Sequence, residues 1–104
     1  EGRDDEMIVS GGENVFPAEV ENALARHDSV HEAAAIGVPD DEFGQRLRAF
    51  VVIIDEVSES ELKDWVKQQL ARYKVPREIV FMDELPRNAT GKILKRELKE
   101  YDHS

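Results

Sequence analysis

A chain of 104 residues, 40% of them hydrophobic and 36% charged, has the composition of one globular domain, which excludes disorder and a second independent core. It has no cysteine, no visible signal peptide and no apolar stretch near the ~20 residues of a transmembrane helix, so we expect a cytoplasmic protein without disulfides or a membrane span. The formal net charge of −9 argues against binding to nucleic acid or to an anionic membrane, because both attract basic proteins.

The N-terminal part of the chain predicts a hairpin followed by a helix. In the segment MIVSGGENVF, residues 7–16, two β-prone runs flank Gly11 and Gly12. Two glycines between such runs are typical of a two-residue turn, so a β-hairpin is expected. Pro17 suits the first position of a helix, and apolar residues then recur at helical spacing, which predicts an amphipathic helix over residues 17–27.

The central part of the chain predicts two strands. Residues 30–36, VHEAAAI, are expected to form the first strand, and residues 37–45, GVPDDEFGQ, are expected to form a loop. The second strand is predicted at residues 46–54, RLRAFVVII, where the continuous apolar run indicates a central position that is covered on both faces.

The next helix has clear signals at both ends. Ser58 and Glu61 match a capping box, which marks the start of a helix. The helix must end by about Lys74, because Pro76 disfavours helical geometry in the residue before it. The predicted buried face consists of Leu62, Trp65, Val66 and Leu70.

The C-terminal part predicts a third strand at residues 77–83 and a short helix at residues 92–98. The residues expected to point inward from this last helix are Ile93, Leu94 and Leu98. The order of hairpin, helix, two strands, helix, strand and helix predicts an α+β fold. This fold would be a small three-stranded sheet with packed helices and an N-terminal β-hairpin.

Lys92 ends the segment PRNATGK, residues 86–92, just before this last predicted helix. A cation in the first turn of a helix opposes the helix dipole, so a negatively charged ligand is one reason for its presence. A Walker A phosphate loop is excluded, because Pro86 and Ile93 stand where that motif needs glycine and serine or threonine. A simple surface turn remains the alternative. The basic residues near this end of an acidic chain are Arg87, Lys92, Lys95, Arg96 and Lys99.

Two other segments have plain structural explanations beside functional ones. SGGEN, residues 10–14, is either a hairpin turn or a place where a ligand passes close to the backbone. Arg3 precedes three acidic residues, and taken by itself it is explained by a solvent-exposed ion pair with one of them. The histidines, which lack the spacing of metal ligands, are His27, His31 and His103.

In combination, two motifs carry a resemblance to a known family. GRDDEMIVSGGENVFPAEVE at residues 2–21 and LPRNATGKILKREL at residues 85–98 resemble the C-terminal domain of the adenylate-forming superfamily of acyl-CoA synthetases, nonribosomal-peptide adenylation domains and luciferases. The first motif is most similar to the acyl-CoA synthetase branch, including the fatty-acyl-CoA ligases. The resemblance covers the whole chain and implies that residues 1–104 are a mobile lid, which closes over a large N-terminal adenylation domain.

The resemblance implies an ATP-dependent acid–thiol ligase that converts a carboxylic acid to acyl-AMP and then to a CoA thioester. In this family Lys92 corresponds to a catalytic lysine that contacts the substrate carboxylate and the α-phosphate during adenylation. Arg3 matches an arginine that reaches the nucleotide. Asp5 aligns with the hinge about which the domain rotates between half-reactions, and the adjacent Asp4 is the alternative.

A second set of residues is assigned by the resemblance to CoA and its pantetheine arm. These residues are Ser10, Gly11, Gly12, Phe43 and Tyr73. Val75 stands where some CoA ligases have a basic residue, which weakens the prediction for that mode of CoA binding.

The full-length enzyme would use ATP, Mg²⁺ and CoA, and the isolated domain is expected to be inactive and to bind none of them tightly. The context of Lys92 also resembles sites at which acyl-CoA synthetases are acetylated, a change that would neutralise its charge. Two alternatives remain. The chain could belong to an adenylation domain that loads a carrier protein, or it could be a stand-alone, non-catalytic binding module of the same fold.

Overall fold

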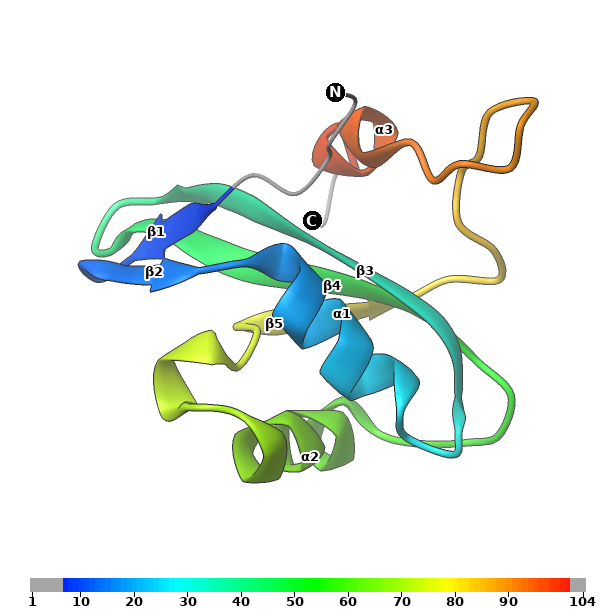
Figure 1. Cartoon of the computed structure of the whole chain (residues 1–104), viewed down its shortest axis with the longest axis horizontal. Helices are drawn as coiled ribbons and strands as arrows, with labels where there is room; N and C mark the ends of the chain where they lie inside the picture. Colours follow the sequence, from blue (N-terminus) through cyan, green and yellow to red (C-terminus); the bar gives the residue numbers. More distant parts are fainter. Residues whose placement is uncertain (1–6, 102–104) are drawn as a thin grey trace.

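The computed structural model describes residues 7–101, which fold into one α+β domain with two small sheets (Figure 1). The elements in chain order are β1 (Ile8–Ser10), β2 (Glu13–Val15), α1 (Pro17–Ala25), β3 (Val30–Asp40), β4 (Gly44–Ile53), α2 (Glu59–Gln69), the 3₁₀ helix η1 (Arg72–Lys74), β5 (Glu78–Phe81) and α3 (Lys95–Lys99). The predicted three-stranded sheet with packed helices and an N-terminal hairpin is confirmed. Among residues 7–101, no helix has the length and apolarity needed to cross a bilayer.

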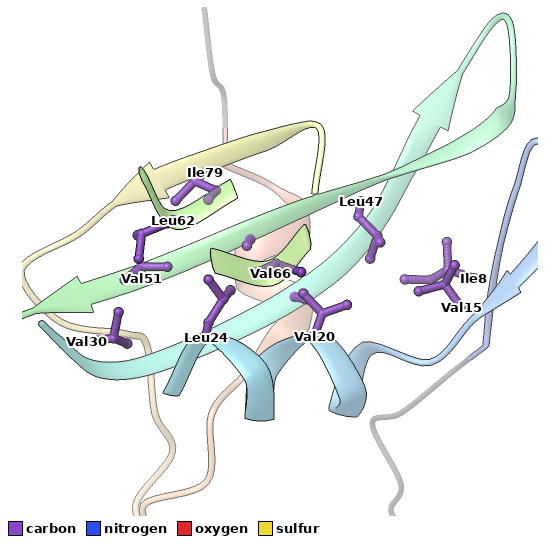
Figure 2. Packing of buried hydrophobic residues seen from close by; sticks show 12 residues of the cluster. Ile8, Val15, Val20, Leu24, Val30, Leu47, Val51, Leu62, Val66 and Ile79 are labelled. Atoms are coloured by element: carbon purple, nitrogen blue, oxygen red, sulfur yellow. The ribbon is translucent and has the colours of Figure 1, made fainter. Parts of the chain in front are cut away.

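The larger sheet has the order β3-β4-β5, with β4 in the centre as predicted. β4 pairs antiparallel with β3 and parallel with β5. Because successive side chains of a strand point to opposite faces, β4 supplies both hydrophobic clusters of the domain. Leu47 and Val51 face α1 and α2, whereas Phe50, which is fully buried, packs in a second cluster with Leu98 of α3. Figure 2 shows side chains of both larger helices directed toward the face of β4 that carries Leu47 and Val51.

The segment at residues 37–45 is not the predicted loop. β3 continues to Asp40 and β4 begins at Gly44, so only residues 41–43 form the connection. Pairing along this long hairpin and burial of Val38 outweigh the turn preference of the sequence. Pro39 is tolerated because β3 is an edge strand of the sheet.

The C-terminal helix begins later than predicted. α3 covers Lys95–Lys99, and Lys92 lies before it in a loop rather than in a first helical turn. The reason lies in the backbone hydrogen bonds, since Leu94 N donates to Pro86 O at 2.9 Å and Asn88 N donates to Lys92 O at 2.9 Å. These bonds pair residues 92–94 with residues 86–88, so residues 92–94 cannot join the helix.

The start of α2 is confirmed at the predicted residue. Ser58 Oγ accepts a hydrogen bond from Glu61 N at 3.1 Å, as an N-cap does. Of the predicted buried face, Leu62 and Val66 are fully buried, and the half-buried Trp65 donates from Nε1 to the carbonyl of Ala23 at 2.7 Å. This bond ties α2 to α1.

Candidate functional site

Four of the five residues predicted for CoA line one hollow of about 410 Å³, which we call the hairpin pocket. It lies between the β1–β2 turn, the β3–β4 connection and η1. Its lining consists of Ser10, Gly11, Glu13, Phe43, Leu47, Arg72, Tyr73, Val75 and Arg77. Gly12, the fifth predicted residue, is exposed in the same turn but is not part of the lining. The structure therefore brings together residues that are more than 60 positions apart in the sequence.

The β1–β2 turn lies directly against Phe43. Gly11 N donates a hydrogen bond to Phe43 O at 3.0 Å. Gly11 and Gly12 have φ angles of 60° and 86°, the left-handed conformation that favours glycine. A Cβ atom on Gly11 would lie 3.1 Å from Phe43 Cδ1, whereas one on Gly12 would meet no atom within 4 Å. Gly11 thus permits the close approach of the turn to the aromatic ring.

Asp40 holds the short connection that presents Phe43. Its Oδ1 accepts hydrogen bonds from Glu42 N and Phe43 N, both at 2.8 Å. The bond from Phe43 N is the main reason that the pKa of Asp40 is lowered, and partial burial opposes this shift. The sequence analysis missed this residue. An aspartate two or three positions before a loop residue is a known turn signal, and it could have identified the role.

The hairpin pocket also contains two arginines that the sequence analysis did not assign. The Arg77 guanidinium lies 4.9 Å from the centroid of the Phe43 ring, within range of a cation–π contact, and Arg72 lines the same hollow. Val75 is half-buried and supplies no charge. The pocket therefore combines two half-exposed aromatic rings with two arginines and one carboxylate, that of Glu13, and the excess of positive charge suits an aromatic anion.

Lys92 belongs to a separate structure, which we call the lysine loop and define as residues 86–94. The loop is closed by an isolated antiparallel bridge between Arg87 and Ile93. Gly91, which precedes the lysine, has a φ of 90°, so its backbone conformation favours glycine. Lys92 itself is exposed at the surface.

The hairpin pocket and the lysine loop lie at opposite ends of the domain. In Figure 1 the β1–β2 hairpin is at the left and the loop between β5 and α3 is at the upper right. Lys92 is therefore not brought together with the residues predicted for CoA. Arg3 and Asp5, with the alternative Asp4, lie outside the described residues. Within residues 7–101, no three His, Cys, Asp or Glu side chains converge to hold a metal ion.

Comparison with known proteins decides the family. Residues 19–92 match the family model of the AMP-binding enzyme C-terminal domain. This chain belongs to that family. The chain is 47% identical over 98 residues to the 2-succinylbenzoate–CoA ligase of Bacillus cereus (strain Q1). The alignment covers 94% of this chain and 20% of that protein. The chain thus spans about a fifth of the length of the curated relatives it matches.

Solved structures of family members have the same fold. The fatty acyl CoA synthetase of Mycobacterium tuberculosis is 48% identical, with a TM-score of 0.86 over 90% of this chain and 19% of that one. The o-succinylbenzoate CoA synthetase of Bacillus subtilis, in complex with its acyl-adenylate intermediate, is 44% identical, with a TM-score of 0.86 over 92% of this chain and 20% of that one. The resemblance to the C-terminal domain of adenylate-forming enzymes is confirmed, and the roles of individual residues remain predictions.

Proposed function

We propose that this chain is the C-terminal lid of an acyl-CoA synthetase, which converts a carboxylic acid and ATP to acyl-AMP and pyrophosphate and then transfers the acyl group to CoA with release of AMP. The observation that carries the proposal is the presence of two differently built sites at opposite ends of one domain. A reaction in two half-reactions needs such an arrangement if the domain presents each end in turn by rotation. The CoA-ligase names of relatives that match nearly the whole chain support it.

Lys92 is the proposed catalytic residue of the first half-reaction. A carboxylate oxygen of the acid attacks the α-phosphorus of ATP, and the bond to pyrophosphate breaks. Negative charge is spread over the phosphorus-bound oxygens in the transition state, and the Lys92 ammonium on its flexible stem neutralises part of it. A full charge pair at about 4 Å in an effective dielectric near 20 is worth roughly 4 kcal/mol, or about a thousandfold in rate.

The hairpin pocket is the proposed CoA site of the second half-reaction. The backbone of Ser10 and Gly11 lines the hollow and would contact the pantetheine arm, and the aromatic rings of Phe43 and Tyr73 would stack on the adenine ring. Val75 lacks the charge that some ligases have at this position. Arg72 and Arg77 offer cations to the CoA phosphates from the same hollow.

We favour free CoA over a carrier protein as the acyl acceptor. A phosphopantetheine arm on a carrier protein has no adenine nucleotide, so it would leave the aromatic rings and arginines of the pocket without a ligand. We therefore expect thioester formation with free CoA to exceed that with a phosphopantetheinylated carrier protein, and the opposite preference would support the carrier-loading alternative.

The remaining parts of the reaction belong to the full-length enzyme. A large N-terminal domain of the same chain would hold the acid and most of the ATP, and Mg²⁺ would enter with the nucleotide. Arg3 would contact that nucleotide, and Asp5 would be the hinge residue. Acetylation of Lys92 by a lysine acetyltransferase would neutralise its ammonium group and stop adenylation until a deacetylase restored it.

Substitution of Lys92 in the full-length protein tests the function. Lys92→Ala should lower acyl-AMP formation about a thousandfold, measured as pyrophosphate release, and should spare thioester formation from supplied acyl-AMP. Lys67→Ala is the matched control, because it removes an equal charge from an exposed position of α2, outside the lysine loop. Equal loss of both half-reactions in Lys92→Ala would contradict the assigned role.

A further inference from the structure

The lysine loop is organised by the side chain of Asn88. Its Oδ1 accepts three hydrogen bonds, from Thr90 N at 2.9 Å, from Thr90 Oγ1 at 2.7 Å and from Lys92 N at 3.0 Å. The Asn88 backbone N donates to Lys92 O at 2.9 Å. Both backbone polar groups of Lys92 are therefore bonded to the same residue.

The loop is also anchored to the body of the domain on both sides. Before Lys92, the Arg87 guanidinium donates to Gly91 O at 2.7 Å and pairs with Glu32 of β3. After Lys92, Lys95 Nζ lies 2.6 Å from the Glu21 carboxylate of α1, with only 13% of the Lys95 side chain exposed. A rotation of the domain would therefore carry the lysine loop with it as a fixed part.

We propose that Asn88 is a positioning residue for Lys92 in the adenylation step; this inference rests on the proposed function. The Lys92 side chain is long and exposed, so the direction in which it leaves the loop depends on its backbone. That backbone is held by the Asn88 amide oxygen and the Asn88 N–H. Small misplacements of a catalytic group, of about 1 Å, can cost roughly a hundredfold in rate.

Three variants of the full-length enzyme test this role. Asn88→Ala removes the side-chain acceptor and should lower kcat for acyl-AMP formation by roughly ten- to a hundredfold, with little change in KM for ATP. Asn88→Asp keeps an oxygen at the same position and should recover most of the rate. Gln68→Ala removes an exposed side-chain amide from α2, outside both sites, and should behave as wild type.

Thioester formation from supplied acyl-AMP distinguishes positioning from a general loss of structure. We expect this second half-reaction to be unchanged in Asn88→Ala, because the hairpin pocket lies at the other end of the domain. Equal loss of both half-reactions, or an Asn88→Asp variant as slow as Asn88→Ala, would overturn the inference.

The Lys92→Ala variant separates failure of this inference from failure of the proposed function. If Lys92→Ala loses adenylation and Asn88→Ala retains it, the positioning role is wrong and the proposed function stands. If Lys92→Ala adenylates at the wild-type rate, the catalytic role of Lys92 is wrong and the positioning role falls with it. If the full-length wild-type enzyme forms no acyl-AMP from a carboxylic acid and ATP, the proposed function itself is wrong.

Discussion

The two glycines of the β1–β2 turn provide a matched pair of substitutions. Both have a positive φ, at 60° for Gly11 and 86° for Gly12. Only at Gly11 would an added Cβ lie close to another atom, at 3.1 Å from Phe43 Cδ1. Gly11→Ala and Gly12→Ala therefore share the backbone cost and differ in the contact with Phe43.

The backbone cost sets the expected change in stability. An L-residue in the left-handed conformation costs about 1–2 kcal/mol, so each variant should lose about this much free energy of unfolding. In a domain of 104 residues, each kcal/mol of lost stability lowers the Tm by roughly 4–8 °C. Urea denaturation of the 104-residue chain measures both variants under identical conditions.

The contact with Phe43 sets the expected difference in function. The Gly11→Ala methyl group must displace the Phe43 ring by a few tenths of an ångström, and this ring lines the hairpin pocket. An extra methyl group in a fitted pocket costs about 1–3 kcal/mol, so the KM for CoA should rise about tenfold or more in Gly11→Ala. Gly12→Ala should change it less. Equal effects of the two variants on the KM for CoA would refute the assignment of the pocket, and wild-type stability of Gly12→Ala would refute the backbone argument.

Two further predictions concern Ser58 and Asp40. Ser58→Ala removes the N-cap bond to Glu61 N and should destabilise the chain by about 1 kcal/mol in urea titrations; a change below about 0.3 kcal/mol would show that the cap contributes little. The pKa of Asp40 is lower in the folded chain than the ~3.9 of an unfolded aspartate, so its carboxylate stabilises the fold above about pH 5. This contribution is lost as the pH falls through the pKa of the unfolded state and then that of the folded state. The stability difference between wild type and Asp40→Asn should therefore be constant above about pH 5 and should shrink as the pH falls from there through the lowered pKa of the folded state; a constant difference down to acid pH would contradict the role of the charge.

Much of the candidate site was predicted from two motifs and their resemblance to a family. That prediction named Phe43 and Tyr73 beside the glycine turn, and the fold places them in one pocket. It missed Arg77 and Asp40, because a sequence does not show which ring or backbone amide a side chain will reach. Asn88 was treated only as a turn former, since its bonds to Lys92 appear only once the loop has closed.

The sequence by itself determined the local features of this protein: the glycine turn, the Ser58 cap and a central strand apolar on both faces. Each depends on the conformational preferences or burial of residues that are neighbours in the chain. Only the tertiary structure decided that β5 runs parallel to β4, that residues 37–45 are mostly strand and that Lys92 precedes its helix. These features depend on hydrogen bonds and packing between distant segments, and such interactions contribute free energy only after the chain has brought the segments together.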